Sequence, residues 1–441
     1  MQTIELTLQF NTPVFARGGS DGFEITPQSI KGIMRFWYRA LLPNVIDIHR
    51  CGKDTKPYCG MKRAEELLFG STTQRSLFDV EVETKGIRQD FGSWGTNPHH
   101  GGMVFNPKEF PASSGGNYAA YGMSPKPGDT IRKYLTPGSQ AILTFVFRNK
   151  SLTEEMRDFF LYLWGVISMF GGIGAKSRKG YGSFDIEKVK VNGEDFDFSP
   201  TRILYPRELH EILGMVNPRI INVLRNLDNE TLIVFEPQVI DVVPPFPILQ
   251  SNCWFYRKKY VNSDWKSALE GIFSGKGIRG KRSYEGIFNI YRTVKIKRLR
   301  LKNSEDKDGV QAVREIIYSQ PPSYPHDQWE VAPTILGLPL LYQNIGPTKD
   351  STGPHTGEVN NPTGRKASPL FVSIHKKNNN TFAFLLLIPS QISSERTKDD
   401  KPILTVKPST KKDKEFPVLG NEDFADLKNK LLAAFDGGGN P

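Results

Sequence analysis

Hydrophobic and polar residues alternate strictly at the start of the chain. Ile4, Leu6, Leu8 and Phe10 occupy every second position between residues 3 and 10. A period of two residues places these side chains on one face of an extended segment, as in a strand with one buried face. We therefore expect the chain to open with a strand of a sheet.

The next hydrophobic pattern has the spacing of an α-helix. Thr26 is a favourable N-cap residue, and Pro27 suits the first helical position. Apolar residues then recur three or four positions apart, namely Ile30, Ile33, Met34, Trp37 and Leu41. This pattern predicts an amphipathic helix that starts at Pro27 and ends before Pro43.

Further segments continue the pattern as far as residue 191. They are predicted as a short helix Met61–Leu68, strands Leu77–Thr84 and Gln140–Arg148, a mostly apolar helix Thr153–Phe170 and strand Ser183–Val191. Apart from the short helix, the order is β-α-β-β-α-β, which is the ferredoxin-like or RRM-like arrangement. Residues 86–138, rich in Gly, Pro, Ser, Tyr and His, predict an inserted hairpin or binding loop. We expect an α+β domain over residues 1–199.

A second ferredoxin-like domain is expected over residues 200–441, although this half follows the order poorly. Residues 200–229 predict a helical bridge, and Thr231–Val243 predicts a strand that opens the second unit. The later predicted elements are helix Ser263–Phe273, strand Ile287–Leu301, helix Gly309–Ser319, strands Leu370–Lys376 and Thr381–Ile388 joined at residues 378–380, and helix Glu422–Phe435. Residues 343–368 form another loop rich in Gly, Pro and Asn.

The composition is that of a folded, loop-rich protein. Hydrophobic residues make up 38% of the 441 positions, beside 40 glycines and 31 prolines. Three cysteines cannot build a disulfide framework, and no apolar stretch approaches the roughly 20 residues that cross a bilayer. The first residues also lack the pattern of a signal peptide. We therefore expect a cytoplasmic protein that makes no contact with a membrane.

The positive charge is concentrated in one segment. The chain carries a net charge of +11, and residues 253–302 hold fourteen basic and three acidic residues. The same segment contains Trp254, Phe255, Tyr256, Trp265, Tyr284 and Tyr291. Cations interleaved with aromatic rings favour a polyanion such as nucleic acid, because cations hold phosphates and rings stack on bases. A solvated basic strand and loop is the alternative.

The most specific local motif is a glycine-rich loop at residues 171–182. Residues 172–182 read Gly-Ile-Gly-Ala-Lys-Ser-Arg-Lys-Gly-Tyr-Gly. Its glycines permit positive φ angles that aim backbone N–H groups at an anion, Lys176, Arg178 and Lys179 supply charge, and Tyr181 offers a ring for stacking. A Walker A loop does not fit, because Ala175 precedes Lys176, and a dinucleotide fingerprint does not fit, because a helix precedes the loop and a strand follows it. An ordinary helix C-cap with extra glycines remains as an alternative.

Three cations recur every four residues on the first predicted helix. Lys31, Arg35 and Arg39 form one basic stripe. By local pattern alone, such a stripe is typical of a solvated outer face.

Three segments resemble RAMP proteins of the type III-B CRISPR effector, the Cmr complex, and most closely the family of its first subunit. They are Thr12 to Phe15 with Arg17-Gly18-Gly19, the block from Ile25 to Ala40, and the glycine-rich loop. Arg365 to Leu370 adds weaker support. The resemblance implies two ferredoxin-like modules, other Cmr subunits as partners, and contact with CRISPR RNA near its 3′ part and with target RNA.

The resemblance also implies that the basic stripe of Lys31, Arg35 and Arg39 is a candidate RNA-binding surface. The RNA-binding residues that we predict are Arg17, Lys31, Arg35, Arg39, Gly172, Gly174, Lys176, Arg178, Lys179, Gly180, Tyr181, Gly182, Arg279, Lys281, Arg282 and Arg365. The segment 253–302 and the loop 343–368 contribute the last four.

Catalysis is not expected, and neither is a cofactor or a metal. Of the seven histidines only His99 and His100 stand together in a predicted loop, where a solvated pair is the usual finding. A zinc site of His49, Cys51, Cys59 and His99 lacks the usual Cys-x2-Cys spacing. Two alternatives stay open, a free-standing endoribonuclease of the same fold that processes CRISPR transcripts, and a scaffold that binds an acidic protein.

Overall fold

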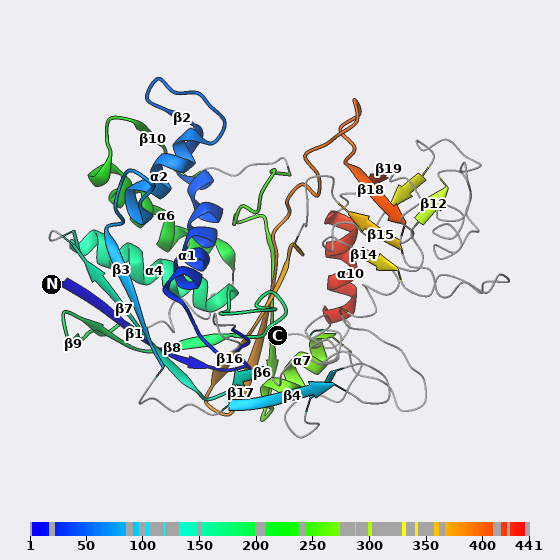
Figure 1. Ribbon diagram of the computed structural model, residues 1–441, viewed down its shortest axis with the longest axis horizontal. Coiled ribbons are helices and arrows are strands. Elements are labelled where there is room, and N and C mark those ends of the chain that lie inside the picture. The colour runs from blue at the N-terminus through cyan, green and yellow to red at the C-terminus, as the bar shows by residue number, and fades with distance from the viewer. Residues whose placement is uncertain are drawn as a thin grey trace. The chain divides into compact units, whose positions relative to one another are not determined.

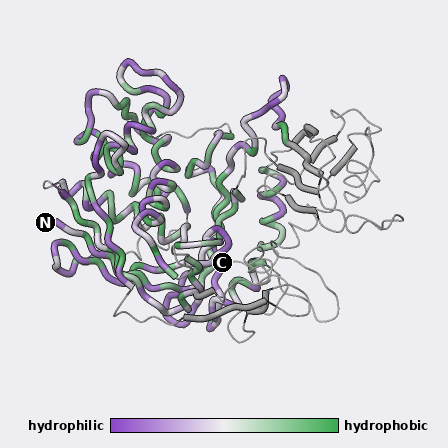
Figure 2. Tube along the Cα trace, viewed as in Figure 1, coloured by the Kyte–Doolittle hydropathy of each residue, from purple (hydrophilic) through white to green (hydrophobic). Residues whose placement is uncertain are grey.

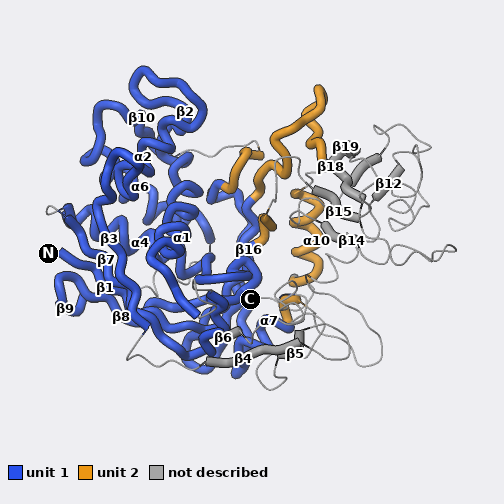
Figure 3. Tube along the Cα trace, in the orientation of Figure 1, with its two compact units in different colours: residues 1–242, 248–270, 371–388 blue, residues 243–247, 271–370, 389–441 orange. Residues whose placement is uncertain are grey.

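The computed structural model forms two compact units (Figure 3). It describes residues 2–16, 23–84, 91–96, 103–105, 119, 132–148, 151–198, 208–237, 243–273, 287, 299–301, 329–331, 340–342, 357–360, 367–408, 416–420 and 424–436. Unit 1 comprises Met1–Val242, Ile248–Glu270 and Phe371–Ile388, and unit 2 comprises the remaining segments 243–247, 271–370 and 389–441. The predicted boundary between residues 199 and 200 falls on residues outside the described part and stays a prediction.

Unit 1 is built around a five-stranded sheet with the order β3-β7-β1-β8-β9 (Figure 1). The strands are β1 Gln2–Phe10, β3 Phe78–Glu83, β7 Gln140–Phe147, β8 Phe184–Val191 and β9 Glu194–Asp195. All neighbouring strands are antiparallel, and Leu6 of β1 lies opposite Leu143 of β7 and Val189 of β8. The first four strands have the order of a ferredoxin-like sheet, so the prediction for the N-terminal elements is confirmed.

Helices α1 (Pro27–Leu41) and α4 (Glu154–Phe170) pack against this sheet. The Oγ1 atoms of Thr26 and Thr153 cap them, each accepting a hydrogen bond of 3.2 Å from the N–H three residues on. The four alternating apolar residues of β1 are fully buried, as their period of two predicts, and Figure 2 shows the alternation of hydropathy along these strands. Phe145 of β7 and Phe160 of α4 meet at a ring distance of 4.7 Å in the core.

A second layer of unit 1 contains α2 (Cys59–Phe69), α6 (Leu209–Leu227) and a two-stranded sheet. That sheet pairs β2 (Ile46–Cys51) with β10 (Leu232–Val234). The strand predicted at Thr231–Val243 was expected to open a second unit, and this expectation was wrong. Of its described residues, 231–237 and 243, only Leu232–Val234 form a strand. This strand pairs with β2 within unit 1, where Leu232 is buried opposite Cys51.

Unit 1 also contains a three-stranded antiparallel sheet made from distant parts of the chain. Its order is β11 (Trp254–Tyr260), β17 (Asn380–Leu387) and β16 (Leu370–Lys377). Asn378 takes a positive φ of 54° in the hairpin between β16 and β17, which confirms the predicted asparagine turn. Helix α7 (Trp265–Phe273) follows β11.

The insertion at residues 86–138 contains an antiparallel sheet of three described strands. They are β4 (Phe91–Thr96), β5 (Met103–Phe105) and β6 (Arg132–Leu135), with β4 in the centre. The segment therefore includes a hairpin, as predicted.

Unit 2 contains a mixed six-stranded sheet and helix α10 (Phe424–Asp436). The strand order is β12 (Leu299–Leu301), β13 (Trp329–Val331), β19 (Phe416–Gly420), β18 (Ile403–Pro408), β15 (Gly357–Asn360) and β14 (Leu340–Tyr342). The α+β class is confirmed, whereas a second ferredoxin-like module stays a prediction. The predicted helix Gly309–Ser319 and most of the predicted strand Ile287–Leu301 lie outside the described residues. In the described part of the chain, no helix is long and apolar enough to span a membrane.

Candidate functional site

The glycine-rich loop, residues 171–182, connects the end of α4 to the start of β8. Its backbone folds onto the segment that follows β1. Ala175 N donates to Phe15 O (2.7 Å), Gly182 N donates to Pro13 O (2.8 Å), and Ile173 N donates to Gly182 O (3.0 Å). These amides are satisfied inside the protein, so the prediction that the loop aims its N–H groups at an anion is wrong for these three.

The glycines of the loop are required by the fold. Gly174, Gly180 and Gly182 have φ angles of +91°, +84° and +67°. A Cβ atom at Gly174 would collide with Phe15 O, and one at Gly180 would lie 2.7 Å from Leu269 Cδ2 of α7. Gly172 is equally confined, because a Cβ atom there would lie 2.8 Å from Tyr181 O. The glycines therefore permit close packing of protein against protein, which accounts for them without an RNA backbone.

Tyr181 is completely buried. Its ring packs edge-on against Phe15 at 5.3 Å, and Phe15 in turn contacts Tyr134 at 5.4 Å. Burial raises the pKa of the Tyr181 hydroxyl. The predicted role of Tyr181 as a stacking surface for a base is therefore wrong for this structure, since neither face of the ring reaches the surface.

Two cations of the loop are half-buried beside β16. The Arg178 guanidinium lies over the rings of Phe36 (5.1 Å) and Phe371 (4.5 Å), and its carbonyl accepts a hydrogen bond of 3.0 Å from Val372 N. Burial lowers the pKa of Arg178 to about 10. Burial and the neighbouring charge of Lys176 lower the pKa of Lys179 to about 7. Lys179 therefore changes its charge near neutral pH, while Arg178 stays charged.

The basic stripe of α1 faces α2 and β3 and is held by protein acceptors. Arg35 Nε lies 3.1 Å from Glu65 Oε1, and Arg39 Nη2 lies 2.8 Å from the same oxygen. Lys31 Nζ donates to Phe78 O at 3.1 Å, and burial lowers its pKa. For Lys31 and Arg35 the interpretation as a solvated face is wrong, because these contacts join the helix to its neighbours. Arg39 pairs with Glu65 and remains exposed.

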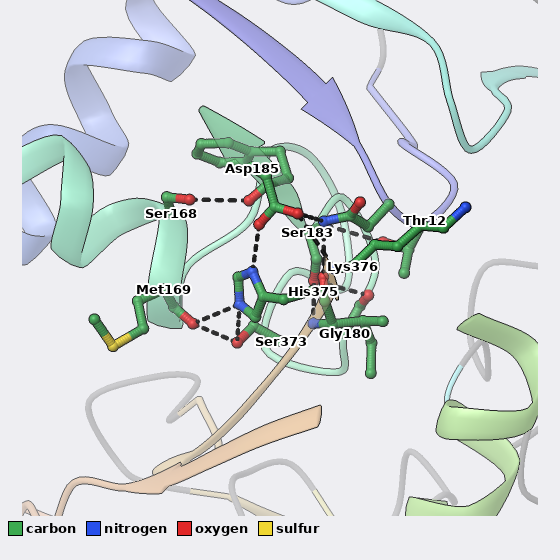
Figure 4. A network of polar contacts seen from close by, with 12 residues as sticks. Thr12, Ser168, Met169, Gly180, Ser183, Asp185, Ser373, His375 and Lys376 are labelled. Atoms are coloured by element: carbon green, nitrogen blue, oxygen red, sulfur yellow. Dashed lines mark hydrogen bonds and ion pairs between the residues drawn. The ribbon is translucent and has the colours of Figure 1, made fainter. Parts of the chain in front are cut away.

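A network of polar side chains around His375 and Asp185 adjoins the loop, which it contacts where Ser183 Oγ donates to Gly180 O (Figure 4). His375 Nδ1 lies 2.7 Å from Asp185 Oδ1, and His375 Nε2 lies 3.0 Å from Met169 O and 3.1 Å from Ser373 Oγ. Asn11 Nδ2 donates to Asp185 Oδ2 at 2.8 Å. The network joins β16 to β8, to α4 and to the end of β1.

The network has the composition of a hydrolase triad but not its accessibility. Ser373 and His375 are 1% and 0% exposed, and the Ser373 hydroxyl donates its hydrogen bond to Met169 O rather than to the histidine. A triad serine must reach a substrate carbonyl, which a completely buried hydroxyl cannot do. We therefore interpret the network as a structural connection. The sequence analysis did not predict this network, because 190 positions separate Asp185 from His375. The available signal in the sequence was the two-residue spacing that places Ser373 and His375 on one face of a strand.

The described residues of the zinc site that the sequence analysis rejected make other contacts. His49 Nδ1 accepts a hydrogen bond of 3.2 Å from Tyr58 N, and Cys59 Sγ lies 3.2 Å from Asp54 O. Within the described ranges, no group of three or more His, Cys, Asp or Glu side chains is placed to hold a metal ion. His99, His100, Arg17, Arg279, Lys281, Arg282 and Arg365 lie outside the described residues.

Comparison with known proteins identifies the N-terminal region. Residues 7–185, which contain the ferredoxin-like sheet and the glycine-rich loop, match the RAMP superfamily. This region is a RAMP domain. The match confirms the predicted family, and it ends at Asp185 within β8.

Two curated relatives come from Pyrococcus furiosus. CRISPR system Cmr subunit Cmr1-1 is 29% identical over 38% of this chain and 41% of its own length. Cmr subunit Cmr1-2 is 32% identical over 19% of this chain and 40% of its own length. The similarity thus spans about two fifths of each relative.

Two solved structures align along most of the chain. The apo crystal structure of Cmr1 from Pyrococcus furiosus matches with 15% identity and a TM-score of 0.47, covering 90% of this chain and 91% of that one. A chain of the type III-B Cmr-beta complex bound to cognate target RNA matches with 14% identity and a TM-score of 0.45, covering 98% of each chain.

Proposed function

We propose that this chain is a non-catalytic, RNA-binding subunit of a type III-B CRISPR effector. It would contact target RNA, the 3′ part of the CRISPR RNA, or both, together with other Cmr subunits. The observation that carries the proposal is the RAMP domain at residues 7–185, whose curated relatives are named as Cmr subunits.

The charge distribution supports a polyanionic ligand. The glycine-rich loop bears Lys176, Arg178 and Lys179 within four residues, and Arg257 and Lys259 are exposed on β11. Each such cation that meets a phosphate releases a counterion, so several of them together provide sequence-independent affinity for RNA. Arg178, placed over two rings, is the most firmly positioned of these groups.

The structure changes what the other predicted residues contribute. Gly172, Gly174, Gly180, Gly182 and Tyr181 would act by holding the loop in shape rather than by touching RNA. Arg39 is the most accessible cation of the stripe, with a side chain that is 48% exposed. It can meet a phosphate while it retains Glu65, whereas Lys31 and Arg35 are more confined.

Binding of the full chain to a labelled single-stranded RNA tests the proposal. If about five phosphates are neutralised, log K against log salt should have a slope near −3.5, from roughly −0.7 per phosphate. RNA should be retained at low salt and remain uncut with and without a divalent cation. A flat salt response would contradict RNA binding, and cleavage of CRISPR repeat RNA by the pure chain would instead support the processing endoribonuclease.

A further inference from the structure

A cavity of about 650 Å³ opens in unit 1 beside the polar network. Four parts of the chain line it: the end of β1, the residues just before β7, the β16–β17 hairpin and the start of α7. Its size falls within the range of about 300 to 1,000 Å³ that is usual for small-ligand sites. None of the predicted RNA-binding residues lines it.

The cavity wall combines an aromatic ring, amides and a cation. The lining residues include Trp265, Lys376, Gln9, Asn11, Asn262 and Asn379. An indole can stack on a base, amides can donate to and accept from the edges of a base, and an exposed lysine can meet a phosphate. This set of groups suits a nucleotide better than an apolar ligand.

The inner side of the cavity is held rigidly. Asn11 Nδ2 donates both to Asp185 Oδ2 (2.8 Å) and to Ile374 O (3.2 Å). Both amide protons are therefore engaged, and the remaining Oδ1 can only accept. His375, itself fixed by Asp185, lies beside it in the lining. A fixed acceptor lowers the entropic cost of binding a base.

The outer side is fixed at the start of α7. Asp264 Oδ1 accepts a hydrogen bond of 2.9 Å from Ser267 N and caps the helix that begins with Trp265. Thr381 Oγ1 donates to Ser263 O at 2.5 Å, which ties this cap to β17. These hydrogen bonds fix the first turn of α7, which carries Trp265. The Trp265 side chain is half-buried, and Lys266 Nζ lies 5.8 Å from its ring centroid.

The geometry points to a pocket for one unpaired nucleotide of a bound RNA strand. The base stacks on Trp265, the amides contact its edge, and Lys376 holds an adjacent phosphate. This inference rests on the proposed RNA-binding function and adds a site apart from the glycine-rich loop. It also assigns aromatic stacking to Trp265, the role that Tyr181 cannot fill.

Binding of a 12-nucleotide oligouridylate and of an abasic 12-mer with the same backbone tests the inference. Trp265→Leu should weaken oligouridylate binding about five- to 150-fold, the range for loss of one stacked base, with the salt slope unchanged. Trp265→Phe should retain most of the affinity because it keeps a ring. Both variants should bind the abasic strand as the wild type does, since that strand has no base to stack.

Lys376 has a matched control in its neighbour Lys377. Both are exposed at the end of β16, but only Lys376 lines the cavity. Lys376→Ala should reduce the magnitude of the salt slope by about 0.7, and Lys377→Ala should leave it unchanged. The inference is overturned if Trp265→Leu weakens binding of the oligouridylate and of the abasic strand equally, or weakens neither. It is also overturned if free uridine monophosphate competes as well as the oligouridylate does. Failure of the wild type to bind either strand would instead overturn the proposed function.

Discussion

His375 and Asp185 form a direct contact, 2.7 Å between Nδ1 and Oδ1, that joins β16 to β8 across 190 positions of sequence. The imidazole is completely inaccessible and lies 4.7 Å from the ring of Phe384. A polar group buried so deeply is stable only while its partners are present. The contact therefore ties the C-terminal β16–β17 hairpin to the RAMP domain within unit 1.

Replacement of His375 by Ala should destabilise unit 1. It leaves a cavity and removes the two ring nitrogens that contact Asp185, Met169 and Ser373, so the free energy of unfolding should fall by about 2 to 4 kcal/mol. Urea denaturation of the full chain would measure the loss, with Lys377→Ala as the control that should change little. An unaltered unfolding midpoint for His375→Ala would show that the network does not hold the hairpin.

Glycine substitutions separate folding from ligand contact. Gly174→Val should destabilise the protein even without RNA, because its Cβ would meet Phe15 O and its φ is +91°. Gly32→Ala is the matched control, since it lies in α1 with nothing within 4 Å of the added atom. It should stabilise the protein by up to about 1 kcal/mol. A Gly174→Val protein with normal thermal stability and lost RNA binding would restore the interpretation of the loop as an RNA clamp.

The pKa of Lys179 predicts two effects of pH. Its folded-state pKa, about 7, is lower than the ordinary value of 10.5, so the unfolded chain binds more protons between these values. The contribution of Lys179 to stability should therefore rise as the pH increases from about 7 towards 10. Any attraction between Lys179 and RNA should weaken over pH 6 to 8, as the ammonium loses its proton.

Lys179→Met tests both effects. Denaturation and RNA binding between pH 6 and 9 should show a weaker pH dependence in the variant than in the wild type. Identical pH profiles for the two proteins would mean that Lys179 titrates outside this range.

The three cations of α1 should differ in their effect on stability. Arg35→Ala should cost about 1 to 2 kcal/mol, because Arg35 is half-buried and contacts both Glu65 and the carbonyl of Phe69. Arg39→Ala should cost at most about 1 kcal/mol, because its pair with Glu65 is more exposed. Lys62→Ala, which removes an exposed pair with Glu66, is the control with almost no effect. Thermal denaturation would rank them, and a larger loss for Arg39→Ala than for Arg35→Ala would contradict this order.

The sequence alone determined the local elements of this protein. Strand β1 follows from the alternation that ends at Phe10, helix α1 from the cap at Thr26 and the proline after it, and the β16–β17 hairpin from its asparagines. These signals lie within a few residues of the structure that they specify. The family could be recognised for the same reason, because its motifs are short and contiguous.

Only the tertiary structure decided what the motifs do. The local sequence predicts that Tyr181 and the glycines of the loop bind a ligand. In the structure Phe15 packs against Tyr181 and lies close to Gly174, and Leu269 lies close to Gly180. The partner of Arg35 and Arg39 is Glu65 on another helix, and the partner of His375 lies on a strand formed 190 residues earlier. The burial of a side chain and the identity of its partner depend on residues that the fold brings together from distant positions. The local hydrophobic pattern therefore cannot predict them.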